Sequence, residues 1–245
     1  MVGKLIIRGI IVGILAGLLA FGFAKTFGEP QVAVAINLES AHAEAERKEA
    51  IAAGKQPEAE EPEMFSRNIQ SGIGLFTGLV AVGAGIGGIF AVLFAFANGR
   101  MGGLGPKATS ALLGLMGLVT IYAVPALKYP ANPPTVGAPE TIKLRTGLYF
   151  LMIAISLAAT LLGVTLNKSL SRRYGWNGSV VAAGAYLVAI CAAFAILPSI
   201  NEVPADFPAV TMWNFRMASL GIQTILWGSI GLLFGYLNGL NSKQA

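Results

Sequence analysis

The sequence predicts an all-α membrane protein with six transmembrane helices arranged as three hairpins. Of the 245 residues, 55% are hydrophobic and only 12% are charged, about half the charged fraction of ordinary soluble domains. Six apolar runs reach the length of about 20 residues that crosses a bilayer as a helix. A spanning segment is either a helix or part of a closed barrel. Because none of the runs alternates with period two, helices are expected.

The whole chain, residues 1–245, is predicted to form a single membrane domain. The first apolar run resembles a signal peptide, but its apolar core exceeds the 7–15 residues of a signal h-region and no clean cleavage site follows. We therefore count it as the first span. In chain order, the spans are expected at residues 5–24, 69–97, 108–127, 146–166, 179–197 and 217–237.

Charge asymmetry predicts that both termini are cytoplasmic. If the connections are assigned alternately to two sides, the side of the N-terminus carries only basic residues: Lys4, Arg8, Arg100, Lys107, Lys168, Arg172, Arg173 and Lys243. The other side carries all twelve acidic residues. Short loops rich in Lys and Arg stay on the cytoplasmic side. We expect a multi-pass protein of the bacterial inner membrane, with lipid as its main partner. The charge distribution also removes the reason to expect nucleic acid from a net charge of +5.

Each outer connection contains proline and at least one carboxylate: "GEPQV" at 28–32, "KYPANPPTVGAPE" at 128–140 and "PSINEVPADFP" at 198–208. Proline is expected to stop the helices here and to stiffen the loops. The connection at 128–140 is interpreted as a rigid outer cap, held by Lys128 and Glu140. Residues assigned to the structure of this cap are Lys128, Pro130, Asn132, Pro133, Arg145, Asn201, Trp213 and Arg216.

The first outer connection, residues 25–68, is long and includes an acidic segment at 39–63. Its first half has helical potential, and "PEAEEPE" follows. A solvated helix with a flexible acidic linker is one interpretation. The other is an arm that collects cations through His42 and several glutamates.

The spans contain glycines at four-residue spacing: Gly9, Gly13, Gly17, Gly74, Gly78, Gly83, Gly87, Gly231 and Gly235. This spacing favours close helix packing, although bare carbonyls could also face a permeation path. The spans lack a central charge of the kind that marks proton relays. Gln223, Ser156 and Met152 remain as candidates for either a pathway or helix packing. No hydrolase or metalloprotease motif occurs, so no enzyme is expected, and the lone Cys191 excludes an intramolecular disulfide.

Polar residues concentrate at the predicted outer helix ends. One interpretation is interfacial anchoring with ion pairs such as Glu140–Arg145 or Glu202–Arg216. The other is a metal-binding vestibule, because carboxylate oxygen and imidazole are ligands for divalent cations. The candidate metal ligands are Glu29, Glu140, Glu202, Asp206 and His42.

Four stretches resemble the CbtA family of predicted cobalt transporter subunits. They are "GKLIIRGIIVGILAGLLAFGFAKTFGEPQV", "GLFTGLV", "VPALKYPANPPTVGAPETIKLRTGLYFLM" and "LPSINEVPADFPAVTMWNFRMASLGIQTILWGSIGLLFG". The resemblance implies cobalt uptake linked to cobalamin synthesis, and a small CbtB partner with one span and a histidine-rich tail. Members often look histidine-rich in the first outer connection, whereas this sequence offers only His42 there.

Two functions therefore follow from the sequence. The first is a membrane transport subunit that moves a divalent metal, with Co²⁺ as the expected bound ion. The alternative is a non-transporting accessory or scaffold subunit of a larger membrane complex, which the charge-free spans favour because a dication crosses hydrocarbon poorly without fixed ligands.

Overall fold

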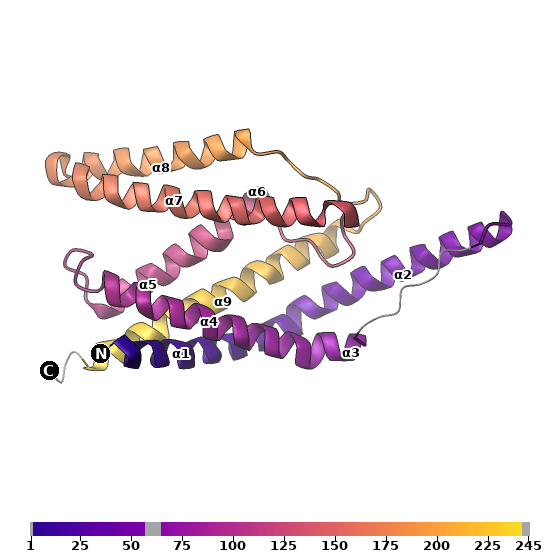
Figure 1. Cartoon of the computed structure of the whole chain (residues 1–245), viewed down its shortest axis with the longest axis horizontal. Helices are drawn as coiled ribbons and strands as arrows, with labels where there is room; N and C mark the ends of the chain where they lie inside the picture. Colours follow the sequence, from indigo (N-terminus) through magenta and orange to yellow (C-terminus); the bar gives the residue numbers. More distant parts are fainter. Residues whose placement is uncertain (1, 57–64, 242–245) are drawn as a thin grey trace. The chain divides into compact units, whose positions relative to one another are not determined.

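A computed structural model describes residues 2–56 and 65–241 of the chain (Figure 1). Within these residues every regular element is a helix. Six described helical runs are long and apolar enough to cross a membrane: Val2–Ala52, Arg67–Ala97, Pro106–Lys128, Pro139–Tyr174, Trp176–Ile196 and Ala209–Gly239. Each predicted span falls on one of these runs, so the predicted all-α class with six membrane-spanning helices is confirmed.

The first run does not stop at Pro30, and the prediction that it would is wrong. It consists of α1 (Val2–Phe23), the π-helical segment η1 (Ala24–Gly28) and α2 (Glu29–Ala52). Proline cannot donate to the carbonyl four residues earlier. The wider π turn just before Pro30 accommodates that missing hydrogen bond, and the helix continues.

A second proline is accommodated in the same way. The third run contains α5 (Pro106–Gly117), π-helical η3 (Leu118–Ala123) and α6 (Val124–Lys128). Pro125 follows the end of η3 at the same distance as Pro30 follows the end of η1. The remaining runs are α3 (Arg67–Ile69), η2 (Gln70–Gly74) and α4 (Leu75–Ala97); η4 (Pro139–Thr141) and α7 (Ile142–Tyr174); α8 (Trp176–Ile196); and α9 (Ala209–Asn241).

The chain divides into two compact units. Unit 1 comprises residues 1–115, 132–136 and 205–245, and unit 2 comprises residues 116–131 and 137–204. The third helical run therefore begins in unit 1 and ends in unit 2.

In unit 1, α1 and α4 lie in backbone contact along glycines. A Cβ built on Gly13 would lie 2.0 Å from the carbonyl oxygen of Gly83, and one on Gly87 would lie 2.1 Å from that of Gly9. Any larger residue would separate the helices, so close packing is the role of these glycines. The same expectation is wrong for Gly78, which has no atom within 4 Å of a built Cβ.

Helix α9 packs against both α1 and α4 in unit 1. The ring of Phe234 lies between Phe90 and Phe94, with centroid separations of 5.5 and 5.1 Å. On α5, the buried hydroxyl of Ser110 donates to the carbonyl oxygen of Gly231 at 2.7 Å. Such a hydrogen bond satisfies a hydroxyl group that lipid cannot solvate.

In unit 2, α7 and α8 form an antiparallel hairpin joined by Gly175 alone. Gly175 has φ +56° and ψ −134°, a conformation that glycine adopts without steric cost. The core of this unit is formed by Val124, Met152, Ala159, Ile190 and Ala193.

Candidate functional site

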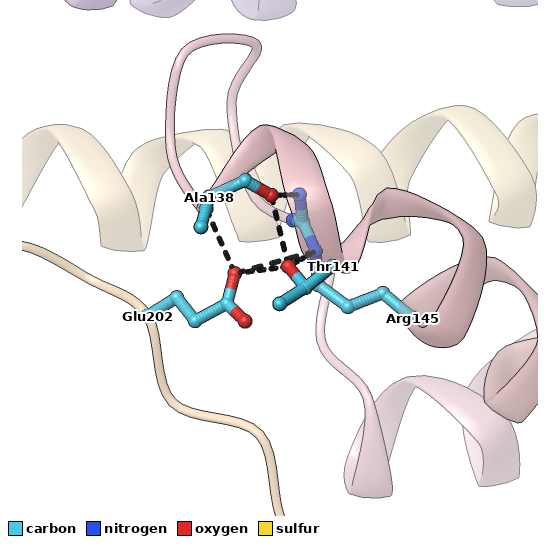
Figure 2. A network of polar contacts seen from close by, with 4 residues as sticks. All are labelled: Ala138, Thr141, Arg145 and Glu202. Carbon is cyan, nitrogen blue, oxygen red and sulfur yellow. Dashed lines mark hydrogen bonds and ion pairs between the residues drawn. The ribbon is translucent and has the colours of Figure 1, made fainter.

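Glu202 lies at the centre of a polar network in unit 2 (Figure 2). Its Oε2 accepts from the backbone N–H of Ala138 at 2.9 Å and lies 2.8 Å from the hydroxyl of Thr141. The Nε of Arg145 lies 3.4 Å from the same oxygen. The side chains of Arg145 and Glu202 are only 27% and 21% exposed. The network joins the start of α7 to the connection that follows α8.

This environment holds the pKa of Glu202 below its usual value. The hydrogen bond from Thr141 contributes most, and the Ala138 N–H and the Arg145 charge add to it. Partial desolvation opposes these effects without reversing them. The carboxylate is therefore charged. Within its own unit it accepts two hydrogen bonds and pairs with one guanidinium, and these contacts hold the start of α7 to the connection that follows α8.

Arg145 completes the network from α7. Its guanidinium donates to the carbonyl oxygen of Ala138 at 3.3 Å, and its Nε donates to Thr141 at 3.1 Å. It also fills the space beside Gly137, where φ is +113° and a built Cβ would lie 2.4 Å from the guanidinium. The ion pair thus joins Glu202 to Arg145, whereas the expected pair Glu140–Arg145 is not formed among the described residues. The expected pair Glu202–Arg216 stays a prediction.

The end of the third run is fastened to the end of α8. Lys128 donates through Nζ to the carbonyl oxygen of Phe194 at 2.8 Å and lies 3.1 Å from Ser199 Oγ. The hydroxyl of Tyr129 donates to the carbonyl oxygen of Pro198 at 2.8 Å. Glu140, expected as the second anchor, is exposed.

The other residues assigned to the cap differ in burial. In unit 1, Arg216 of α9 donates to Asn132 Oδ1 at 2.9 Å, and Pro133 is buried. Pro130, Asn201 and Trp213 are exposed.

Glu29, the first expected metal ligand, is paired with Arg67 in unit 1. Its side chain is only 16% exposed. Beside this pair, Lys25 Nζ donates to the carbonyl oxygen of Ser71 at 3.0 Å. The Glu29–Arg67 pair joins the start of α2 to α3, and the Lys25–Ser71 contact joins η1 to η2, so Glu29 helps to hold the first two helical runs together.

His42 and Asp206 meet in unit 1, although they are far apart in the sequence. His42 Nε2 lies 3.2 Å from Asp206 Oδ2, and the two side chains are 51% and 62% exposed. Unlike Glu29 and Glu202, this carboxylate has a metal-ligating imidazole as its neighbour and no arginine or lysine bound to it among the described residues.

The three candidate pathway residues belong to different units. Met152 and Ser156 are fully buried on one face of α7 in unit 2, and the Ser156 hydroxyl has no hydrogen-bond partner among the described residues. Gln223 belongs to α9 of unit 1 and is partly buried.

A comparison with known protein families shows to which family the chain belongs. The family model of CbtA, described as a probable cobalt transporter subunit, matches residues 2–239. The chain belongs to the CbtA family. No curated protein and no solved structure matches it.

For this CbtA chain, the described residues contain no group of three or more His, Cys, Asp or Glu side chains arranged to hold a metal ion. The nearest approach is the His42–Asp206 pair, which supplies two ligand-type groups in contact. In a tetrahedral or octahedral site the remaining positions would need water, nearby carboxylates or another chain.

Sequence reasoning missed several residues that build these contacts. Thr141 lies one helical turn before Arg145, and this i, i+4 spacing is a signal that was available. Arg67 and Lys25 had no such local signal, because their partners Glu29 and Ser71 lie on another helical run.

Proposed function

We propose that this chain is the membrane-embedded subunit through which a divalent metal, Co²⁺ in the first instance, enters the bacterial cytoplasm to supply cobalamin synthesis. Membership of a family of cobalt transporter subunits supports a role in membrane cobalt transport. The basic side of the chain would face the cytoplasm of an inner-membrane protein. The proposal assigns no bond-making chemistry to the chain.

The contact between His42 and Asp206 carries the proposal at the level of residues. Imidazole and carboxylate both bind borderline divalent cations such as Co²⁺. Both side chains are about half exposed, so an ion from solvent reaches them, and no fixed cation of the described residues competes for the site. Glu29 and Glu202 are poorer ligands because Arg67 and Arg145 already bind them.

Helix α2 can add a further ligand. Glu39 lies three residues before His42 and Glu46 lies four residues after it, so both share its helical face. At these spacings the Cβ atom of each glutamate is about 5–6 Å from that of His42. All three are exposed. An incoming cation held by His42 and Asp206 would recruit one of these carboxylates after a side-chain rotation. A histidine-rich CbtB-like partner would supply or accept the ion next.

The membrane potential would drive the ion inward. It provides about 2.3 kcal/mol per charge per 100 mV, and hence roughly twice that for a dication. This source suits spans without a central carboxylate relay, and it requires no nucleotide site on this chain.

The test is Co²⁺ uptake into vesicles that contain the full chain, with and without its histidine-rich partner. We expect saturable uptake, with the half-maximal Co²⁺ concentration raised at least about tenfold in His42→Gln and Asp206→Asn, since losing a ligand should cost no less than the 10–100-fold of losing its supporting contact. Glu44→Gln is the matched control. Glu44 lies two residues from His42, about 200° around the helix, and binds Lys48.

Two outcomes contradict the proposal. If His42→Gln and Asp206→Asn take up Co²⁺ as the wild type and Glu44→Gln do, the pair is not a metal-binding site. If uptake never exceeds that of empty vesicles even with the partner present, the non-transporting scaffold function is the correct one.

A further inference from the structure

A groove between the end of α7 and the start of α8 has no place in the proposed transport function. It is a half-open cavity of about 240 Å³, lined by Leu170, Tyr174, Asn177, Gly178 and Val181. Its wall is apolar, so Asn177 contributes carbon atoms to it. The groove lies entirely within unit 2.

The sharp turn between the two helices creates this groove. Gly175 alone connects α7 to α8, with φ +56°. Three residues later, a Cβ built on Gly178 would lie 2.4 Å from the carbonyl group of Leu170, so the two backbones touch there. Tyr174 and Val181, which are 54% and 59% exposed, form the sides. These contacts fix the shape of the groove through backbone geometry.

A cation lies beside the apolar wall. The guanidinium carbon of Arg173 lies 5.5 Å from the ring centroid of Tyr174, and Trp176 at the turn is 80% exposed. The sequence contains no acidic residue between Glu140 and Glu202, and no carboxylate of the described residues pairs with Arg173. The positive charge at the end of this groove is therefore available to an external anion.

We propose that this groove binds one anionic phospholipid. The acyl chain would lie along Leu170 and Val181, and the phosphate would accept hydrogen bonds from Arg173. An apolar wall that ends at an arginine matches a lipid, which is apolar along its chain and anionic at its head. Trp and Arg at a helix end occupy the headgroup level of a bilayer, and guanidinium–phosphate hydrogen bonds are strong and directional.

The helix offers its own control for general surface charge. Arg172 and Arg173 lie in the same turn, but Arg173 is about 60° from Leu170 around the helix and Arg172 is about 160° from it. Both arginines add to the attraction of anionic lipids. Of the two, Arg173 is the one whose guanidinium lies over the ring of Tyr174, a residue that lines the groove.

The experiment is native mass spectrometry of the full chain after reconstitution into vesicles of phosphatidylglycerol and phosphatidylcholine. We expect the wild type to retain one phosphatidylglycerol. Arg172→Gln should lose at most roughly fivefold, the effect of one arginine charge near a membrane surface. Arg173→Gln should lose at least about tenfold, because it also loses a hydrogen bond from a charged donor to the phosphate. A second variant, Val181→Phe, fills the groove without changing charge and should lower retention as well.

Retention of phosphatidylcholine at the level of phosphatidylglycerol by the wild type would overturn the proposal, because the groove would then not select an anion. Equal losses in Arg172→Gln and Arg173→Gln would also overturn it, since surface charge alone would explain the binding. Unchanged retention in Val181→Phe would exclude the groove as the site of the acyl chain.

Discussion

Glu202 and Arg145 form an ion pair, with Nε and Oε2 3.4 Å apart, that ties the start of α7 to the connection after α8. The same carboxylate oxygen also accepts hydrogen bonds from the backbone N–H of Ala138 and the hydroxyl of Thr141. Together with the Lys128–Phe194 contact, these interactions make one end of unit 2 an ordered polar assembly. The proline-rich stretch at 128–140 is therefore held at both of its ends by contacts with the segment that follows α8.

Acid is expected to loosen this assembly through Glu202. Its pKa is lowered from 4.5, first by the hydrogen bond from Thr141 and then by the Ala138 N–H and Arg145. A carboxyl group with a lowered folded-state pKa stabilises the fold above its unfolded pKa, and this contribution is lost as pH falls through the folded value. The assembly should be intact at pH 7 and should loosen below about pH 4.5.

Hydrogen–deuterium exchange of segment 137–142, corrected for the intrinsic pH dependence of exchange, measures this loosening. In the wild type we expect protection of the segment to fall several-fold on acidification. Glu202→Gln should show the lower protection already at pH 7 and little further change. An equal acid response in the variant would mean that another group controls the assembly.

Lys128→Met should destabilise unit 2 by about 1.5 kcal/mol, the lower end of the range for a hydrogen bond of a charged group, because this one is partly exposed. The change keeps most of the apolar stem and removes the donor to Phe194 and Ser199. Chemical unfolding in detergent measures the difference in free energy. Lys143→Met is the control, since Lys143 is exposed; equal effects of the two changes would show that the Lys128 contacts contribute nothing.

The six spans could be predicted because long apolar runs have only one stable conformation in lipid. The lengths of the helices could not. Helix α7 continues through Lys168, Arg172 and Arg173 to Tyr174, because backbone hydrogen bonding continues where hydropathy ends. Likewise, no apolar pattern reveals that a π turn carries the first run past Pro30.

The candidate site was less predictable for a different reason. The residue types at the predicted outer helix ends followed from composition, but their partners depend on loop paths. Arg145 binds Glu202 and leaves the neighbouring Glu140 exposed, because Glu202 also receives the Ala138 N–H at the helix start. Within unit 1, the expected ligands His42 and Asp206 contact each other, and nothing in their spacing predicted that contact.

Gly83→Ala should destabilise unit 1 by roughly 1–3 kcal/mol, the usual cost of overpacking. The new Cβ would lie 2.3 Å from the carbonyl oxygen of Gly13, which backbone geometry holds in place. Gly85→Ala is the matched control on the same helix, because no atom lies within 4 Å of its built Cβ. That change should be neutral or stabilise the helix by up to about 1 kcal/mol. Thermal unfolding in detergent compares the two, and a similar result for both would refute backbone contact between α1 and α4.

Two fully buried serines should respond oppositely to replacement by alanine. Ser110 donates to the carbonyl oxygen of Gly231 at 2.7 Å. Ser110→Ala should therefore lower the free energy of unfolding by about 0.6–1.7 kcal/mol, from the mean to the maximum contribution measured for interhelical hydrogen bonds in a membrane protein. The hydroxyl of Ser156 has no hydrogen-bond partner in the part of the chain that the structure describes. Removing an unsatisfied buried polar group is neutral or stabilising by about 1 kcal/mol.

The Ser156 variant also tests whether its hydroxyl contributes to the metal pathway. If Ser156→Ala leaves the unfolding free energy unchanged or raised and also slows Co²⁺ uptake, the hydroxyl acts on the ion during passage. If stability rises and uptake is unchanged, Ser156 is a packing residue, and the pathway does not use this face of α7. A loss of stability would contradict the absence of a hydrogen-bond partner, because it would mean that the Ser156 hydroxyl makes a hydrogen bond in the membrane.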